Sequence, residues 1–368
     1  MLLRRLRHDL PGRGLRRLRY SGLLGLADVT VTGLWAATSR LRRPAALPEP
    51  DRTLSLTVAD RQIVAHDQNV VALTLTAADG SALPPWRPGA HIDVLLPSGR
   101  LRQYSLCGDP GSRTSYRIAV RRIPDGGGGS IEVHESLPIG STVTTNGPRN
   151  AFPLSVPGYG SPARRIRFIA GGIGITPILP MLRLAEDLGV DWSMIYVGRT
   201  ADSIPFLDEV RTFGDRVSIR TDDVHGIPAA SDLLGDCPDG TTVYACGPAP
   251  MLTLIREQLA GRDGVELHFE RFAAAPVVGG EEFTATVGSS DQVVVVAADE
   301  TLLAALRRAG VATAYSCQQG FCGTCRMRVL DGVVQHRDTL LTEPERDAGL
   351  MLTCVSRAAA GQNLRLDL

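Results

Sequence analysis

The chain has 368 residues, which is enough for two or three domains with buried cores. Its 39 basic and 39 acidic residues balance, and every basic residue is arginine, so the overall charge does not indicate a nucleic-acid partner. Three of the seven cysteines, Cys107, Cys237 and Cys246, are scattered and suggest no disulfide framework, which favours a reducing cytoplasm.

Residues 1–50 differ in composition from the rest of the chain. They hold ten arginines against Asp9, Asp28 and Glu49, and an apolar run spans residues 21–38. Asp28 and three glycines weaken that run as a membrane span. Three interpretations remain open for this basic N-terminal extension. It is an amphipathic segment for a partner or a membrane surface, a structural arm packed on the catalytic body, or an export signal.

Four cysteines near the C-terminus carry the most specific pattern. Cys317, Cys322 and Cys325 are spaced C-x4-C-x2-C, and Cys354 follows after 28 intervening residues. This is the plant-type spacing in which four thiolates hold a [2Fe-2S] cluster. A zinc site usually shows two short C-x2-C pairs, and the first pair is lacking here. The pattern therefore predicts a [2Fe-2S] cluster.

Residues 51–158 alternate short apolar runs with turn residues, as in an antiparallel barrel. Arg102, Tyr104 and Ser105 lie together on one expected strand and offer a guanidinium, an aromatic ring and a hydroxyl suited to a flavin. A glycine run at residues 126–129 leads into an expected helix, whose first N–H groups suit a phosphate. The expected strands are residues 54–60, 70–77, 91–96, 102–106, 115–120 and 142–145.

Residues 159–272 change to a strand–helix–strand rhythm, which predicts an open α/β sheet. The first strand ends in the glycine-rich turn of residues 171–177, and a helix is expected over residues 178–188. Functional groups that follow strand ends mark the ligand edge of such a sheet, so the Cys246 thiol is expected to face a nicotinamide. The expected strands are residues 165–170, 192–197, 217–221, 242–245 and 265–269.

Residues 273–282 carry mostly small side chains, which predicts a linker between domains. The last segment, residues 283–368, is expected to form a compact unit of strands and one helix around the cysteine loop. Its expected elements are strands at residues 283–287 and 292–297 and a helix at residues 301–309.

The order Arg-x-Tyr-Ser, Gly-Gly-Ile-Gly-Ile-Thr-Pro, Cys-Gly-Pro and plant-type cysteines resembles the phthalate dioxygenase reductase family over roughly residues 52–368. The resemblance implies an antiparallel β-barrel that binds FMN, an α/β open parallel-sheet domain that binds NADH, and an α+β β-grasp ferredoxin domain. It also implies a reductase that takes a hydride onto FMN. Single electrons then pass through the [2Fe-2S] cluster to a Rieske-type or cytochrome P450 oxygenase.

Carried over by position, the resemblance assigns flavin contacts, nucleotide contacts and cluster ligands. The hydride site is expected near Cys246, Phe272 and Ser105, with Glu270 close by and no general base assigned. This chain has Gly127 where the family carries an arginine, so Arg102 or Arg121 would have to compensate at the phosphate. The flavin set is Arg102, Tyr104, Ser105, Ala119, Val120, Arg121, Gly128, Gly129, Ser130 and Phe272. The nucleotide set is Gly172, Gly174, Thr176, Arg199, Thr200, Cys246, Gly247 and Met251, and the metal set is Cys317, Cys322, Cys325 and Cys354.

Several alternatives stay open at this point. FAD could replace FMN, and Arg199 could pair with the 2′-phosphate of NADPH, although no second cation follows it. A redox-sensing binding protein would use the same cofactors without turnover. His91 is interpreted as a structural residue of the barrel. We expect a cytoplasmic monomer whose acceptor docks at the rim of the cysteine loop, around Gln318, Gln319 and Phe321.

Overall fold

The computed structural model describes residues 52–67, 69–124, 128–156, 163–272, 277–315, 318–320, 323–338 and 340–368. The chain divides into the units Met1–Asp51 and Arg52–Leu368. The expected basic extension of residues 1–50, the two ligands Cys317 and Cys322, Phe321, Gly127 and linker residues 273–276 all lie outside the described residues. Within the described part, no helix has the length and apolar character needed to cross a bilayer.

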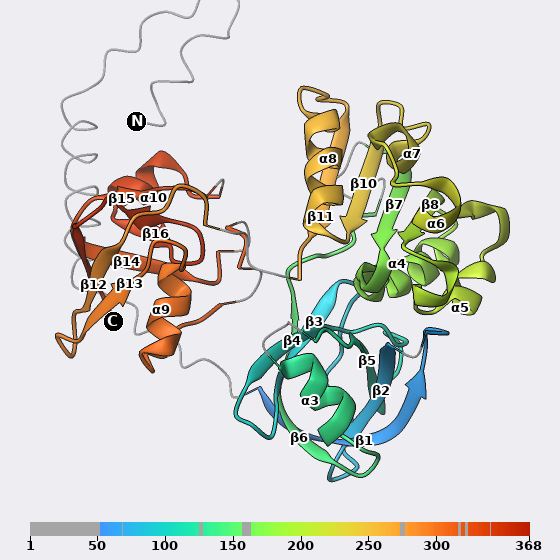
Figure 1. The fold of residues 1–368 in the computed structure, drawn as a ribbon, viewed down its shortest axis with the longest axis horizontal. Coiled ribbons are helices and arrows are strands. Elements are labelled where there is room, and N and C mark those ends of the chain that lie inside the picture. Colours follow the sequence, from blue (N-terminus) through green and yellow to red (C-terminus); the bar gives the residue numbers. More distant parts are fainter. Residues whose placement is uncertain are drawn as a thin grey trace, which may run out of the picture. The chain divides into compact units, whose positions relative to one another are not determined.

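The first domain of the second unit is an antiparallel barrel (Figure 1). Its strands run in the order β4-β3-β6-β1-β2-β5, and the Cys107 amide donates to the Arg117 carbonyl (2.8 Å) where the ends of the sheet meet. Buried side chains alternate along the strands and fill the interior. The elements are β1 (Thr53–Ile63), β2 (Val70–Ala77), β3 (Ala90–Leu95), β4 (Leu101–Ser105), β5 (Ser115–Arg121), α3 (Gly129–Ser136) and β6 (Thr142–Asn150).

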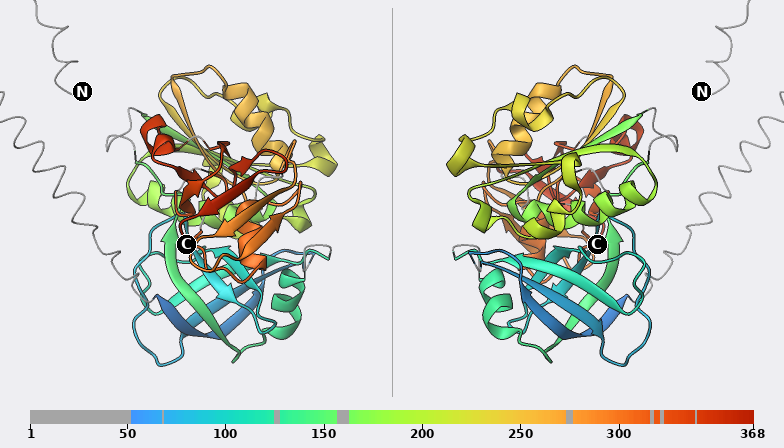
Figure 2. Two further views of the ribbon diagram at one scale, coloured as in Figure 1. Left: turned by 90° about the vertical axis from the view of Figure 1, so that its left-hand side faces the viewer. Right: turned by 90° about the vertical axis from the view of Figure 1, so that its right-hand side faces the viewer.

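Helix α3 packs against the barrel beside β5 (Figures 1 and 2). Its Val133 side chain is fully buried in the barrel core. All six expected strands of this domain are present, and β1 and β6 run several residues beyond the expected ends. The extra length of β6 comes from the stretch after Thr145, whose glycine and proline obscure the strand pattern in the sequence. Pairing of that stretch with β3 supplies the ladder that local propensity does not indicate.

The second domain is a five-stranded parallel sheet in the order β11-β10-β7-β8-β9. Both faces are covered, which explains why its strands read as continuous apolar runs. The strands are β7 (Arg165–Gly171), β8 (Asp191–Gly198), β9 (Val217–Thr221), β10 (Thr241–Cys246) and β11 (Val265–Glu270). The helices are η1 (Gly172–Gly174), α4 (Ile175–Asp187), η2 (Ala201–Ser203), α5 (Leu207–Arg211), η3 (Gly214–Arg216), α6 (Asp222–His225), α7 (Ala230–Leu234) and α8 (Ala249–Leu259).

Neighbouring side chains of the central strand β7 pack into two different hydrophobic cores, one on each face of the sheet. Phe168 packs with α4 and α5 in a core that also takes Phe152 and Cys107 of the barrel, whereas Ile169 packs with α7 and α8. Helix α4 begins at Ile175, three residues before the expected start. Pro177 lies in its first turn, where the backbone N–H has no helical partner, so the proline does not delay the helix.

The third domain has a mixed sheet in the order β13-β12-β18-β14-β16 with α9 against it. Strands β12 and β18 are parallel neighbours, whereas β12–β13 and β14–β18 are antiparallel. The sequence patterns indicated only β12, β13 and α9, and the five later strands and α10 were not predicted. The elements are β12 (Phe283–Val287), β13 (Val293–Val296), α9 (Leu302–Arg308), β14 (Arg326–Asp331), β15 (Val334–Gln335), α10 (Glu343–Asp347), β16 (Leu350–Leu352), β17 (Arg357–Ala358) and β18 (Asn363–Leu366).

Candidate functional site

The expected flavin motif lies on β4, which is hydrogen-bonded to β3 on one side. Ser105 is 7% exposed, and Tyr104 is half-buried. Burial raises the pKa of Tyr104 to about 12, so its hydroxyl stays protonated at neutral pH. Ala119 and Val120 of β5 are buried in the same domain. The strand pair therefore offers an aromatic ring and two hydroxyls at one end of the barrel.

The start of α3 forms a close cradle around the Arg102 side chain. Gly128 has a φ of 80° and precedes the helix as its cap. A Cβ built on Gly129 would lie 2.4 Å from Arg102 Nε, so a larger residue there would displace the guanidinium from the helix start. Free N–H groups at a helix N-terminus and a guanidinium suit a phosphate. This cradle fits the phosphate of a flavin nucleotide.

Two other expected phosphate contacts are used differently. The Ser130 hydroxyl accepts from the Ile123 amide (3.0 Å) and donates to the Ile123 carbonyl (3.2 Å), which closes the loop before α3. Arg121 donates through Nη2 to the Ser203 carbonyl of the second domain, and burial lowers the pKa of its guanidinium. Arg121 thus ties the barrel to the nucleotide domain, which leaves Arg102 as the candidate arginine for the phosphate.

At the second domain's strand ends, two glycine-rich turns pack on each other. A Cβ on Gly174 would lie 2.2 Å from the Cys246 carbonyl oxygen, and one on Gly247 would lie 3.0 Å from Gly171 Cα. Gly172 has a φ of 53° and meets only the end of Arg121, so this position leaves open space. Gly174 and Gly247 are therefore required for packing, whereas Gly172 alone offers the close approach expected for a pyrophosphate.

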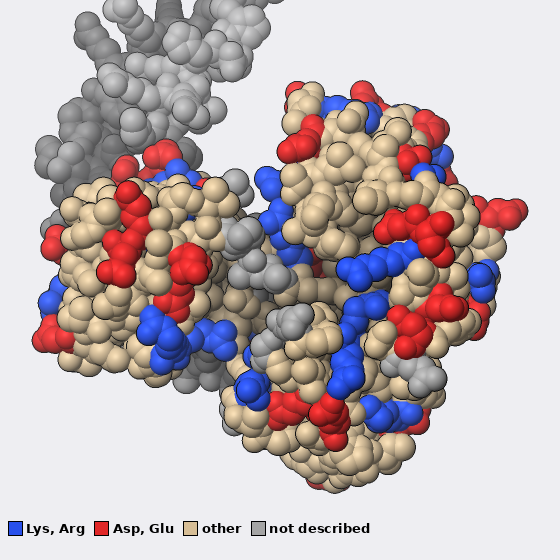
Figure 3. Space-filling view, in the orientation of Figure 1, with Lys and Arg blue, Asp and Glu red and all other residues tan. Residues whose placement is uncertain are grey.

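The remaining expected nucleotide contacts also divide into residues that support the local fold and residues that stay open to a ligand. The Thr176 hydroxyl is buried and donates to the Ile173 carbonyl (3.0 Å), so it supports the turn. Thr200 caps η2 through a reciprocal pair of hydrogen bonds with Ser203. Arg199 is exposed at the end of β8. Arginine side chains gather where the barrel and the sheet domain meet, on the face drawn in Figure 3.

The expected hydride centre contains a buried carboxyl group. Cys246 and Glu270 are register partners on β10 and β11, Cys246 is fully buried and Glu270 is 9% exposed. Burial raises the pKa of Glu270 to about 8, and burial together with Glu270 raises that of the Cys246 thiol well above its usual value. Glu270 Oε2 has no hydrogen-bond partner among the described residues. Phe272, two residues on, is 52% exposed and follows the strand.

Glu270 was indicated in the sequence only by its place beside Phe272, because a lone acidic residue at a strand end gives no sign of burial. His91, which was interpreted from the sequence as a structural residue of the barrel, is a second buried titratable group. It is 5% exposed, and burial, with Arg149, lowers its pKa to about 4, so the imidazole is neutral near pH 7.

The described half of the cysteine set lies in one small core. Cys325 and Cys354 are 5% and 2% exposed and pack with Leu303, Tyr315, Leu341 and Leu352. Gly320 and Gly323 have φ values of 83° and 74°, and a Cβ on Gly320 would lie 2.8 Å from Val355. The loop can therefore turn tightly only with glycine at these positions, as a cluster loop requires.

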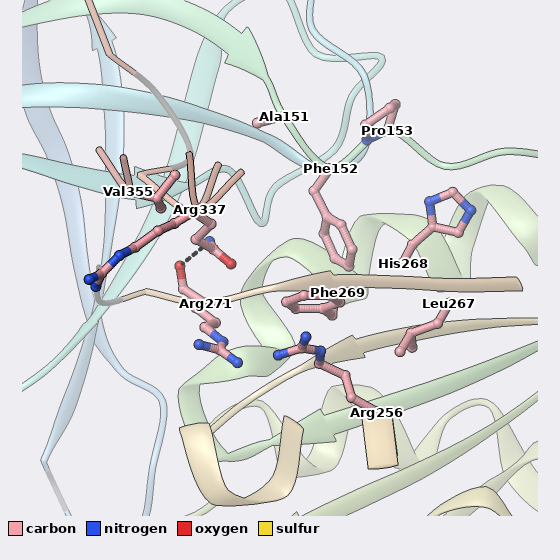
Figure 4. A pocket seen from close by; sticks show the side chains of 11 residues that line it. Ala151, Phe152, Pro153, Arg256, Leu267, His268, Phe269, Arg271, Arg337 and Val355 are labelled. Atoms are coloured by element: carbon pink, nitrogen blue, oxygen red, sulfur yellow. Dashed lines mark hydrogen bonds between the residues drawn. The ribbon is translucent and has the colours of Figure 1, made fainter. Parts of the chain in front are cut away.

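A crevice of about 560 Å³ opens beside the cysteine loop (Figure 4). The Gln319 amide donates to the Arg271 carbonyl (3.0 Å), so this side of the loop rim faces the end of β11. The guanidinium carbons of Arg256 and Arg271 lie 5.4 and 5.6 Å from the Phe269 ring centroid, and Arg337 lines the same crevice. The crevice is therefore basic and lined in part by aromatic rings.

These sites define a three-module electron carrier: a barrel with a flavin-phosphate cradle, a parallel sheet with a nucleotide edge, and a ferredoxin domain. Residues 285–359 match the family model of the 2Fe-2S iron-sulfur cluster binding domain. The chain is 39% identical to phenoxybenzoate dioxygenase subunit beta of Ectopseudomonas oleovorans over 82% of its own length and 93% of that protein.

Among solved structures, that of phthalate dioxygenase reductase is described as a modular structure for electron transfer from pyridine nucleotides to [2Fe-2S]. The two sequences are 32% identical, and the structures align with a TM-score of 0.65. The alignment covers 88% of this chain and 100% of phthalate dioxygenase reductase. Full-length CYP116B46 from Tepidiphilus thermophilus is 37% identical, with a TM-score of 0.65 over 89% of this chain. This chain spans 44% of that longer protein.

The chain belongs to the phthalate dioxygenase reductase family. It is an oxidoreductase of the class that serves oxygenases, and its C-terminal domain is a [2Fe-2S] ferredoxin. The fold expected from the sequence, with barrel, nucleotide sheet and ferredoxin in that order, is confirmed.

Proposed function

We propose that the protein is an NADH-dependent reductase that uses FMN and its [2Fe-2S] cluster to pass single electrons to a separate terminal oxygenase. The observation that carries this is the union of all three modules in one compact unit, Arg52–Leu368, with direct contacts between them. NADH gives two electrons together and the cluster accepts one. FMN supplies the conversion between two-electron and one-electron transfer when it is bound.

The chain's residues act mainly by holding and orienting. Arg102 and the first N–H groups of α3 bind the flavin phosphate, while Tyr104 and Ser105 contact the ring system. FMN is proposed because the family resemblance carries no further contacts for an adenine. Its identity is settled by releasing the flavin from denatured protein and analysing it.

Replacing Gly129 with alanine should weaken FMN binding by at least about tenfold. The new Cβ would collide with Arg102 Nε, and the guanidinium would lose its charge-assisted contact with the phosphate. Fluorescence titration of the apoprotein with FMN measures the change. Gly140→Ala is the control for an added methyl group away from the cradle, since nothing lies within 4 Å of its Cβ. Gly140 has a positive φ (90°), which Gly129 lacks, so alanine there adds backbone strain but no contact with Arg102. Equal affinities in the two variants would contradict the cradle.

The nucleotide binds at the ends of β7, β8 and β10, with Gly172 beneath the pyrophosphate and Arg199 near the adenosine half. NADH is proposed over NADPH because one exposed arginine is accompanied by Asp202, Asp222 and Asp223, whose charges disfavour a 2′-phosphate. The protonated carboxyl of Glu270 donates a hydrogen bond to the nicotinamide carboxamide. Because this carboxyl is buried at the strand end, it would position the nicotinamide ring and take no part in the hydride transfer itself.

The acceptor is proposed to be a Rieske-type or cytochrome P450 oxygenase, as the names of the relatives suggest. Because Gln319 faces Arg271, the acceptor approaches the cluster from the side of Gln318. The expected cytoplasmic location and monomeric state are part of this proposal. The N-terminal extension would act as a partner-docking or membrane-surface segment or as a structural arm, and deleting it while assaying both cytochrome c and the true acceptor distinguishes these roles.

Anaerobic titration with NADH tests the central claim. The flavin band should bleach at a rate compatible with turnover, and the electron paramagnetic resonance signal of the reduced cluster should follow. With NADPH, the same rate should need a much higher concentration. A flavin that NADH cannot reduce would overturn the proposal and favour a redox sensor.

A further inference from the structure

Tyr315 occupies an unusual position, two residues before Cys317 and at the edge of the ferredoxin domain. It is 8% exposed and packs with Cys325 and Cys354 in the small core of the cysteine loop. Two guanidinium groups face its ring. The Arg307 carbon lies 4.2 Å from the ring centroid, and the Arg149 carbon lies 5.9 Å from it. Arg307 belongs to α9 of the ferredoxin domain, whereas Arg149 belongs to β6 of the barrel.

Arg149 is held in place by the barrel itself. Its Nη2 donates to Asp93 Oδ2 (2.5 Å), and the Asp93 side chain is only 3% exposed. Gln103 Nε2 donates to the other carboxylate oxygen of Asp93 (3.0 Å). Gln103 is the register partner of Asp93 and lies between the proposed flavin contacts Arg102 and Tyr104. The guanidinium that meets Tyr315 is thus fixed to the flavin strand through one buried carboxylate.

A second contact joins the same two regions. Leu101, the first residue of β4, packs against the ferredoxin core that contains Tyr315, Cys325 and Cys354. The strand that carries the flavin motif therefore touches the cysteine-loop core at one end. Through Gln103, Asp93 and Arg149 it also reaches the ring that precedes the loop.

We propose that Tyr315 and Arg149 form a positioning contact that holds the cysteine loop against the flavin strand and so sets the rate of electron transfer from flavin to cluster. This inference rests on the proposed function, in which NADH supplies the electrons. In the step concerned, one electron leaves the NADH-reduced flavin and reduces the oxidised cluster by one unit. No bond is formed or broken between the two groups.

The contact suits this role because it combines a cation–π interaction with a buried anchor. A guanidinium over an aromatic ring is most effective where water is excluded, and both Tyr315 and Asp93 are buried. A flexible arginine would hold a ring loosely, but the ion pair with Asp93 fixes the orientation of Arg149. Loss of the ring should leave the barrel and the ferredoxin core folded while the docked arrangement becomes less populated.

Stopped-flow single turnover with NADH tests the proposal on the holoenzyme. In Tyr315→Leu, the flavin should be reduced at the wild-type rate, whereas the following reduction of the cluster should be slowed about fivefold or more, the effect expected for loss of a desolvated cation–π contact. Tyr315→Phe keeps the ring and should behave as wild type. Arg307→Met removes only the guanidinium of the ferredoxin domain itself and should also leave the rate of cluster reduction unchanged.

Two further measurements keep the outcome clear. The midpoint potential of the cluster should be equal in wild type and Tyr315→Leu, which excludes a changed driving force. Should Tyr315→Leu lose its cluster, the double variant Arg149→Met/Asp93→Asn probes the contact from the barrel, removing both buried charges together so that neither is left unpaired. It should slow cluster reduction to a similar extent.

Cluster reduction at the wild-type rate in Tyr315→Leu, or in the double variant if the first cannot be loaded, would overturn the inference. Failure of NADH to reduce the flavin in the wild-type protein would instead overturn the proposed function. The two failures are therefore distinguishable within one experiment.

Discussion

Replacing Cys354 with alanine is expected to abolish NADH-dependent reduction of cytochrome c while reduction of ferricyanide continues. Cys354 is 2% exposed and shares its core with Cys325, and it is the expected fourth ligand, supplied by a distant segment of the chain. Without a fourth thiolate the cluster is not held. Ferricyanide can take electrons from the flavin directly, so this activity reports the barrel and nucleotide domains alone.

Iron and sulfide analysis of the purified variant gives the first measurement, and the two activities give the second. Cys237→Ala is a suitable control, because Cys237 is also buried (6% exposed) but lies in the core beside α7 and α8. It should retain its cluster and both activities. Full cytochrome c reduction by Cys354→Ala would show that the expected ligand set is wrong.

Patterns local in the chain predicted most of the architecture. The alternation of apolar residues placed all six strands of the barrel, and the apolar runs placed the five strands of the parallel sheet. The short strands β15, β16 and β17 were not predicted, because two or three residues carry no periodicity. Their pairing depends on partners far away in the sequence, as in the contact of Val334 with Ala358.

The motifs placed the candidate sites, but the roles of single residues needed the structure. Thr176 and Ser130 both carry hydroxyls in glycine-rich turns, and in both the hydroxyl is used inside the turn. The sequence pattern predicts that Gly174 binds a ligand, yet the adjacent Cys246 carbonyl already leaves no space for a side chain at this position. Which polar groups remain for a ligand depends on three-dimensional neighbours, and one sequence does not contain that information.

The relation of Tyr315 to Arg149 shows the same limit over a longer distance. The two residues are 166 positions apart and belong to different domains, and neither forms part of a recognisable motif. Only the fold brings the ring beside the guanidinium. The family resemblance predicted that flavin and cluster cooperate, and the contact suggests how this chain keeps them together.

Replacing Glu270 with glutamine should remove a pH dependence from both NADH binding and stability. The carboxyl is 9% exposed, and burial raises its pKa to about 8. Below that pH the acid donates a hydrogen bond to the carboxamide, and above it the carboxylate cannot. The Michaelis constant for NADH in the wild type should therefore rise about tenfold above about pH 8, whereas the amide of the variant keeps its donor at every pH.

Stability should follow with a sign that linkage fixes. Native Glu270 keeps its proton up to about pH 8, while in the unfolded chain it is lost near the ordinary value of 4.5. The native state thus holds more protons between these values, and the free energy of unfolding falls as the pH rises through that window. The glutamine variant should lack this decline, so it gains stability relative to the wild type as the pH rises from about 4.5 to about 8.

Urea unfolding midpoints and steady-state kinetics at matched pH values measure both effects. Glu266→Gln is the control, because Glu266 lies four residues earlier on the same strand and is only half-buried, beside His268. It should keep the wild-type pH profile in both assays. A Glu270→Gln protein whose Michaelis constant still rises above about pH 8 would show that another group controls nucleotide binding, and the buried carboxyl would then be structural.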